Sequence, residues 1–393
     1  MSTLISAADR VYHSNNKPQN VDVVVVGAGQ AGLATGYLLQ QHGLDFVILD
    51  AGKRVGDTWR NRWDSLRLFS PARYDQLPGK PFPTDPFYYP TKDEYADYLE
   101  AYAQQFELPV HLNTRVEHVT RSEDRYLVTT ADQTYMAENV ISAMSSFQIP
   151  YKPAFASELD PAIKQMHSSG YRRSSQLLAG DVLVVGAANS GAEIAVDIAP
   201  GHRVWLSGRH PGQEPLVGKS ELLDHLFVPI FAGILLHRVL TIDTPVGRKL
   251  RSKVMGHGTP LARTQKSDIE AAGINRVPRV AGVRGGLPQL EDGRVLEVEN
   301  VIWTTGYRPN FSWIDLPIFG GEEDPLEPVH RRGIVKDMPG FYFVGLFFQY
   351  AASSAVIFGM VRDARYVVDH LVARRAEKKA KAPAKSLAVP EQA

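Results

Sequence analysis

The chain has 393 residues, and 44% of them are hydrophobic. It is therefore long enough for two or three domains with buried cores. Lysine plus arginine equal aspartate plus glutamate at 43 each. This balance argues against nucleic acid as a partner and favours small molecules. Cysteine is absent, which excludes a redox-active disulfide, a thiol nucleophile and a thiolate metal site.

Both ends of the chain are predicted to lie outside the folded domains. Residues 1–20 are polar and carry no apolar period, so we expect a flexible leader that is neither a secretory signal nor a membrane anchor. A cytoplasmic location follows by default. Residues 373–393 carry six basic and two acidic side chains among Ala and Pro, which is typical of a basic flexible tail.

One apolar stretch, residues 226–236, runs almost without a polar side chain. It is too short to span a bilayer, so no stable membrane span is expected. We expect a buried helix or packing segment there. An element that lies on a membrane surface or on a partner stays open as the alternative.

Short apolar runs alternate with helical stretches between residues 21 and 372. The clearest are VDVVVVG, DFVILD, DVLVVG, RVWLSG, VIWTTG and FYFVG. Continuous runs rich in Val and Ile are typical of strands buried on both faces of a parallel sheet. The predicted fold class is therefore α/β, and two of the runs open similar glycine-rich units.

The first glycine-rich turn follows a strand directly and precedes a helix. Its residues are Gly27, Ala28, Gly29, Gln30, Ala31 and Gly32. In this G-x-G-x-x-G pattern Gly27 permits the tight turn, Gly29 lets a diphosphate approach the backbone, and Gly32 lets helix and strand pack closely. The helix N-terminus then offers free amides to the phosphates. Asp50 ends the next strand, where a carboxylate can bind a ribose. The whole unit predicts a dinucleotide site.

The second turn departs from this pattern at its middle position. The residues concerned are Gly186, Ala188, Asn189, Ser190 and Gly191.

A methyl group at Ala188 would crowd a diphosphate, although it is the smallest departure available. The strand that follows ends in Ser207 and Arg209 instead of an acid. A hydroxyl and a guanidinium suit a ribose 2′-phosphate, so NADPH is favoured over NADH. The alternative is that Arg209 is an ordinary solvated loop arginine.

With two such turns, the chain resembles the class B flavin-dependent monooxygenases. The likeness is strongest to the flavin-containing, N,N-dimethylaniline monooxygenase-like group, in the YUCCA-like branch of plant indole-3-pyruvate monooxygenases and their bacterial relatives. It extends from about residue 21 to residue 371. The segments that carry it are GAGQAGLATGYLL, GDTWRNRWDSLRLFSPARYDQLPGKPFP, YPTKDEYADYLEAY, HSSGYRR, VVGAANSGAEIA, LSGR and WTTGYRPN.

The resemblance implies two Rossmann-like dinucleotide-binding domains, the second inserted in the first. Residues 21–150 plus 307–372 would form the FAD-binding domain, and residues 151–306 the NADPH-binding domain.

The resemblance also implies a set of flavin contacts. Thr58 and Trp59 would contact FAD, although Trp59 is equally well explained as a core aromatic. Near the isoalloxazine would lie Arg67, Phe69 and Ser70, and Ser70 is also the one candidate catalytic residue. Val116 would meet the adenine through its backbone.

Several positions depart from the family pattern. Only the H-x-x-x-Y half of the fingerprint F-x-G-x-x-x-H-x-x-x-Y is present, at residues 167–171. Many relatives carry Ala-Thr-Gly where this chain reads Ala-Met-Ser at residues 143–145, and animal-type members carry asparagine at the position of Phe69. Together with Ala188, these departures leave a divergent or weakly coupled enzyme open.

The implied reaction consumes NADPH and O2. NADPH would reduce FAD, and a C4a-hydroperoxyflavin would pass one oxygen atom to a small amine, sulfide or 2-oxo acid. Two alternatives stay open: an NADPH-dependent flavin reductase or oxidase that does not oxygenate, and a non-catalytic flavoprotein redox sensor. No hydrolase, metalloprotease or P-loop motif is present, and we propose no metal site. A homodimer is left open.

Overall fold

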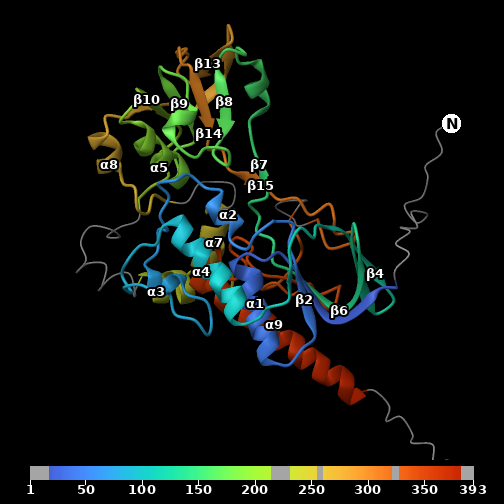
Figure 1. Cartoon of the computed structure of the whole chain (residues 1–393). Coiled ribbons are helices and arrows are strands. Elements are labelled where there is room, and N and C mark those ends of the chain that lie inside the picture. Colours follow the sequence, from blue (N-terminus) through green and yellow to red (C-terminus); the bar gives the residue numbers. More distant parts are fainter. Residues whose placement is uncertain (1–16, 214–230, 255–259, 321–326, 382–393) are drawn as a thin grey trace, which may run out of the picture.

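The computed structural model describes residues 17–213, 231–254, 260–320 and 327–381. These residues form two lobes, each built around its own sheet (Figure 1). Most of the predicted leader, residues 1–16, and the end of the predicted tail, residues 382–393, lie outside the described residues.

The first lobe is built on a seven-stranded sheet in the order β3-β2-β1-β6-β5-β4, with β16 also paired to β6. Its strands are β1 (Gln19–Val26), β2 (Phe46–Leu49), β3 (Val110–His111), β4 (Val116–Ser122), β5 (Arg125–Thr130), β6 (Thr134–Ser142) and β16 (Phe341–Phe343). Strand β1 is parallel to β2 and β6, whereas β4, β5 and β6 form an antiparallel meander.

The valine run of β1 is buried on both faces, as predicted. Val23 and Val25 pack into the core that contains the helices, and Val24 and Val26 pack into a second core on the other face of the sheet. Successive strand side chains point to opposite faces, so an unbroken valine run suits a strand covered on both sides.

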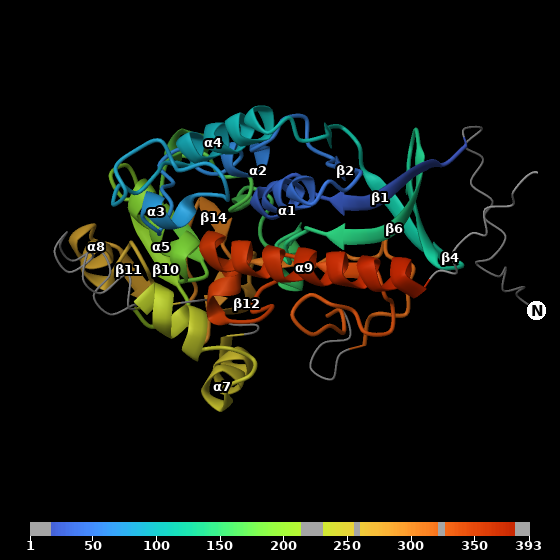
Figure 2. The ribbon, with the colours of Figure 1, turned by 90° about the horizontal axis from the view of Figure 1, so that it is seen from below.

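Three long helices belong to the first lobe: α1 (Gln30–Gln41), α4 (Lys92–Gln105) and α9 (Ile357–Lys381). Helices α1 and α9 contact each other along the sheet (Figure 2). Between α1 and α4 the chain forms two single turns, α2 (Asp57–Arg60) and α3 (Ala72–Asp75). A short 3-10 turn, η5 (Ala352–Ala355), precedes α9.

Helix α4 begins with a capping box. The Thr91 hydroxyl accepts a hydrogen bond from the Glu94 backbone amide at 3.2 Å, and the Glu94 carboxylate accepts one from the Thr91 amide at 2.7 Å. Thr91→Ala is expected to lower the free energy of unfolding by about 1 kcal/mol, because the Glu94 amide loses the hydroxyl that accepts its hydrogen bond. Urea unfolding measures this loss. Thr91→Ser, which keeps the hydroxyl, is the control, and an equal loss in both variants would contradict the capping argument.

The second lobe is built on a five-stranded, wholly parallel sheet in the order β11-β10-β9-β14-β8. Its strands are β8 (Lys164–His167), β9 (Val182–Val185), β10 (Val204–Ser207), β11 (Asn275–Val277) and β14 (Asn300–Trp303). Its other elements are η2 (Ala154–Glu158), η3 (Ser174–Gln176), α5 (Asn189–Ile198), α8 (Lys266–Ala271) and the hairpin of β12 (Val280–Arg284) and β13 (Leu287–Leu290).

The second lobe is inserted in the first. All of its sheet strands lie between β6 and β16, and these two strands pair directly in the first lobe. The chain crosses between the lobes through β7 (Ile149–Pro150) and β15 (Tyr307–Arg308), which are antiparallel partners. Here His167 Nε2 lies 3.0 Å from the Gly306 carbonyl oxygen, while His167 Nδ1 accepts from the Ser169 amide. The imidazole therefore ties the end of β8 to the return crossing.

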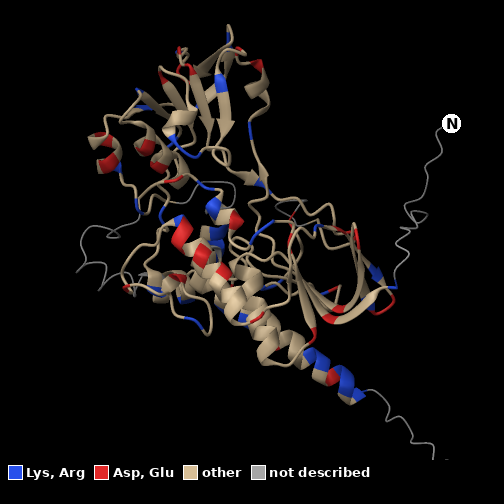
Figure 3. Ribbon diagram, in the orientation of Figure 1, with Lys and Arg blue, Asp and Glu red and all other residues tan. Residues whose placement is uncertain are grey.

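The ends of the folded part differ from the prediction. Strand β1 begins at Gln19, inside the expected leader, and α9 runs to Lys381, past the expected start of the tail. Ala, Arg, Lys and Glu are strong helix formers, so the basic composition continues the helix. Arg375 pairs with Asp22 and Lys378 with Asp124, which fixes the extension against the sheet. In Figure 3 the ribbon at this end of α9 is mostly blue, the colour of Lys and Arg.

The apolar stretch at 226–236 is described only from residue 231 onward. That part is a π-helix, η4 (Phe231–Val239), followed by α7 (Pro245–Val254). Ile234 is 52% exposed and Leu235 38% exposed, so the expectation of a buried helix is wrong for these two residues. Across the described residues, no helix combines the length and apolar character that crossing a membrane requires.

Candidate functional site

The first glycine-rich turn connects β1 to α1. Gly27 has φ of +104°, and a Cβ at Gly32 would lie 1.8 Å from the Gly27 carbonyl oxygen. Both positions therefore require glycine. Gly29 has an ordinary φ of −73°, and a Cβ there would meet nothing within 4 Å. The open side of the turn is thus at Gly29, beside the free amides of α1, and this shape fits a dinucleotide diphosphate.

Asp50 lies beside this turn and holds it. Its Oδ2 accepts a hydrogen bond from the Ala28 amide at 2.6 Å, and its Oδ1 accepts one from the Gly52 amide at 2.6 Å. A carboxylate has about four acceptor positions, so ribose hydroxyls can still be bound. The Gly27 turn also lies close to Met144. A Cβ placed on Gly27 would lie 3.3 Å from the Met144 sulfur. Met144, which departs from the family pattern, therefore lies beside the first turn.

The second turn closely resembles the first in backbone conformation. Gly186 has φ of +111°, and a Cβ at Gly191 would lie 1.8 Å from the Gly186 carbonyl oxygen. Ala188 has φ of −81° and ψ of −173°, close to the −73° and −176° of Gly29. Alanine is therefore unstrained at this position. Its methyl group occupies the side of the turn that Gly29 leaves open.

Asn189 and Ser190 follow at the N-terminus of α5. The Asn189 side chain donates to the Pro260 carbonyl oxygen at 3.0 Å and accepts from the Ala262 amide at 2.9 Å. It therefore anchors the segment after residue 259 to this turn. Ser190 is exposed at the start of the helix.

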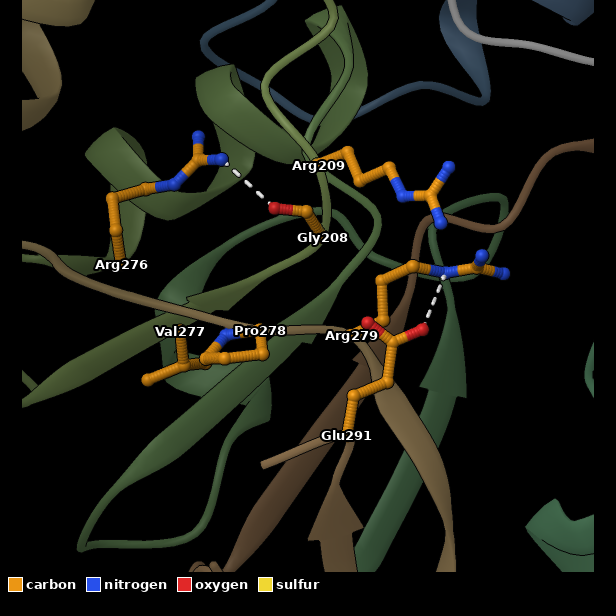
Figure 4. Close-up of a pocket in the computed structure, with 7 residues that line it drawn as sticks. All are labelled: Gly208, Arg209, Arg276, Val277, Pro278, Arg279 and Glu291. Carbon is orange, nitrogen blue, oxygen red and sulfur yellow. Dashed lines mark hydrogen bonds and ion pairs between the residues drawn. The ribbon is translucent and has the colours of Figure 1, made fainter. Parts of the chain in front are cut away.

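A pocket of about 390 Å³ lies at the carboxyl end of β10 (Figure 4). Its lining is Gly208, Arg209, Arg276, Val277, Pro278, Arg279 and Glu291.

Three arginines against one glutamate make this pocket cationic. The Arg209 and Arg279 guanidinium groups point to the same side in Figure 4, and Arg279 lies 3.8 Å from Glu291. Arg276 donates to the Gly208 carbonyl oxygen at 2.9 Å, and burial lowers the pKa of its guanidinium. A phosphate dianion is the ligand that this charge pattern suits.

Sequence reasoning found Arg209 but missed Arg276 and Arg279. The pairing of the strands could have revealed these two arginines. Strand β11 lies parallel to β10, so the carboxyl ends of the two strands share one edge of the sheet.

Ser207 does not line this pocket. It is buried, its hydroxyl donates to the Pro278 carbonyl oxygen at 2.8 Å, and it accepts from the Val280 amide at 3.1 Å. The Ser207 hydroxyl thus fixes the position of the segment that carries Arg279. It contributes to the pocket by holding one of its lining residues in place. Direct contact of Ser207 with a phosphate would require it to leave both partners.

The segment after β2 wraps over the first turn. Trp59 Nε1 donates to Gln30 Oε1 at 3.3 Å, and the Trp59 ring packs edge-on against Tyr95 at 5.0 Å. The tryptophan therefore joins the core and the start of α1 at once. Thr58 lies on the same turn, α2, and is exposed.

The other predicted flavin contacts lie further along this segment. Arg67 is held by the Tyr88 hydroxyl and the Tyr89 carbonyl oxygen, at 3.0 and 2.9 Å. Phe69 is 45% exposed, which is unusual for a large aromatic side chain. Val116 is buried at the start of β4.

The first lobe gathers two helix starts and the wrapped segment in one place. Trp59 of the wrapped segment donates a hydrogen bond to Gln30 at the start of α1, and the Tyr74 ring on α3 lies 5.5 Å from the Phe358 ring on α9. The N-termini of α1 and α9 therefore both approach this segment. Their partial positive charges favour an electron-rich or anionic ligand.

Comparison with known proteins identifies the family. Residues 24–222 match the family described as pyridine nucleotide-disulphide oxidoreductase. An uncharacterized CzcO-like oxidoreductase of Geobacillus kaustophilus is 40% identical over 90% of this chain and 98% of its own. The probable indole-3-pyruvate monooxygenase YUCCA7 of Arabidopsis thaliana is 32% identical over 82% of each chain. The solved flavin-containing monooxygenase from Stenotrophomonas maltophilia is 29% identical, with a TM-score of 0.71 over 91% of this chain and 99% of that chain.

The chain belongs to the class B flavin-dependent monooxygenase family within the pyridine nucleotide oxidoreductases. It is an oxidoreductase that uses FAD and NADPH, as the sequence predicted. The sequence contains no cysteine, so it supplies no redox-active disulfide of its own.

Proposed function

We propose that the chain uses NADPH and O2 to insert one oxygen atom into a small amine, sulfide or 2-oxo acid, through a C4a-hydroperoxyflavin. The observation that carries the proposal is the pair of matching turns at Gly27 and Gly186, of which the second leads to an arginine-lined pocket. FAD supplies the electron and oxygen chemistry when it is bound. The chain supplies binding, orientation and shelter from water.

The contrast between the turns assigns the two nucleotides. Asp50 suits the unmodified ribose of FAD, and a 2′-phosphate beside it would meet like charge. We therefore assign FAD to the first lobe, residues 21–150 plus 307–372, and NADPH to the second, residues 151–306. In this assignment Thr58, Trp59, Arg67, Phe69, Ser70 and Val116 lie along the FAD side.

NADPH preference is tested at Arg209. Arg209→Ala is expected to raise the KM for NADPH about tenfold to a hundredfold, because a charge-assisted hydrogen bond to a phosphate contributes about 1.5–3 kcal/mol. The KM for NADH is expected to change little. Initial-rate kinetics with each nucleotide measures the difference.

The matched control is Arg203→Ala. Arg203 precedes β10 at the opposite end of that strand, is exposed, and pairs loosely with Asp181 at 3.9 Å. Equal losses for NADPH and NADH in Arg209→Ala would remove the 2′-phosphate assignment.

The oxygenation step is tested with purified holoprotein, NADPH, O2 and a panel of amines, sulfides and 2-oxo acids. An oxygenated product formed in proportion to the NADPH consumed, with a transient hydroperoxyflavin absorbance, supports the proposal. Hydrogen peroxide as the sole product would instead identify an oxidase. A flavin that NADPH does not bleach would identify a redox sensor.

A further inference from the structure

Asp75 is a buried acid that the fold does not fully satisfy. It ends α3, its side chain is 0% exposed, and its Oδ2 has no hydrogen-bond partner among the described residues. Burial raises the pKa of its carboxyl well above the usual range, against the opposing effect of the Ser70 hydrogen bond. A buried polar atom without a partner costs stability, so a carboxyl kept in this position calls for a functional explanation.

The other oxygen of Asp75 accepts a hydrogen bond from the Ser70 hydroxyl and so orients it. Ser70 Oγ donates to Asp75 Oδ1 at 2.5 Å. A hydroxyl has one proton, and here that proton points inward. Ser70 itself is half-buried and follows the exposed Phe69. On its open side the hydroxyl therefore presents only lone pairs, which can accept a hydrogen bond but cannot donate one.

The pair lies where the elements of the first lobe converge. Tyr74, next to Asp75, contacts Phe358 in the first turn of α9. On α4, burial and, to a smaller extent, the charge of Asp75 raise the pKa of Tyr95, whose ring packs against Trp59. Trp59 in turn is hydrogen-bonded to Gln30 at the start of α1. Ser70 and Asp75 thus lie in a segment that contacts the first turn of α9 through Tyr74 and the start of α1 through Trp59.

We propose that Asp75 is a positioning residue that fixes the Ser70 hydroxyl as an obligate acceptor toward the flavin. The inference rests on the proposed function, because the flavin is what Ser70 would face. Asp75 acts through Ser70 alone and touches no reacting atom. Its role is to orient one hydroxyl, so that a protonated group on the flavin side finds an acceptor there.

Three variants test the pair. Ser70→Ala removes the hydroxyl, Asp75→Val removes both carboxyl oxygens at similar volume, and Asp75→Asn keeps an acceptor for Ser70. The readouts are the visible spectrum of bound oxidised FAD, the fraction of NADPH electrons recovered as peroxide, and the melting temperature of the FAD-free protein.

We expect Ser70→Ala and Asp75→Val to shift the spectrum equally and to raise the peroxide fraction by up to about tenfold, the effect of one hydrogen bond. The double variant is expected to add nothing further. Asp75→Asn is expected to restore the wild-type spectrum. The melting temperature of Asp75→Val is expected to stay level or rise, because the unpartnered oxygen is gone.

Two results would overturn the proposal. If Asp75→Val and Ser70→Ala differ in spectrum or in peroxide fraction, Asp75 does not act through Ser70 alone. If all three variants keep the wild-type spectrum and peroxide fraction and only their melting temperatures change, the pair is structural. Wild-type protein that binds no FAD would instead refute the proposed function, which separates the two failures.

Discussion

Gly32→Ala is expected to abolish FAD binding and to destabilise the first lobe by more than about 3 kcal/mol. A Cβ there would lie 1.8 Å from the carbonyl oxygen and 2.9 Å from the carbonyl carbon of Gly27. Both atoms belong to backbone, so neither can move without opening the contact between α1 and β1. Flavin content after purification and urea unfolding measure the two effects.

Gly201→Ala is the control for this variant. Gly201 is exposed, and a Cβ there would meet nothing within 4 Å. It is expected to unfold like the wild-type chain. A Gly32→Ala protein that retains wild-type flavin content and stability would show that the close approach at Gly27 is not required.

Gly29→Ala is expected to fold normally and yet lose FAD affinity by about tenfold to a hundredfold. Its φ of −73° suits alanine, and the space around it is open, so the free energy of unfolding has no reason to change. The added methyl would occupy the face through which the diphosphate approaches. Flavin titration of the FAD-free protein measures the affinity.

Ala188→Gly is the reciprocal variant. It opens the same face of the second turn, where Ala188 has nearly the same backbone angles as Gly29. We expect it to lower the KM for NADPH without changing FAD content. If Gly29→Ala binds FAD as tightly as wild type, the diphosphate does not approach the turn at Gly29. The proposed position of the diphosphate would then be wrong.

Much of the fold could be predicted because the strands carry their own signal. Each apolar run named in the sequence became a strand, and Val23 to Val26 alternate between two cores, as a strand covered on both faces must. The glycine-rich turns could also be predicted. Gly27 and Gly186 have positive φ, a conformation that favours glycine whatever the distant parts of the chain do.

Features that depend on distant pairing could not be predicted. Arg279 joins Arg209 only because β11 pairs with β10 across about seventy residues of sequence. The hydrogen-bond partners of Ser207, Pro278 and Val280, come from that same distant segment, so the position of Ser207 at the end of β10 could not reveal them. Burial of Asp75 likewise depends on α4, and nothing near it in sequence signals a buried acid.

The ends of elements were misjudged for a different reason. Basic composition after residue 372 predicted a solvated tail, but the same residues are good helix formers, and Asp22 and Asp124 provide partners for Arg375 and Lys378. These ion pairs hold the C-terminal part of α9 against the first lobe. At Ile234 and Leu235, apolar composition predicted burial, yet both side chains are exposed.

Anaerobic titration of the FAD-reconstituted protein with NADPH tests the central claim most directly. The claim is that the two turns hold two different nucleotides in one electron-transfer unit. We expect yellow protein with one FAD per chain, whose visible absorbance is bleached by one equivalent of NADPH and more slowly by NADH. Protein that stays colourless after incubation with FAD, or bound flavin that NADPH leaves oxidised, would contradict it.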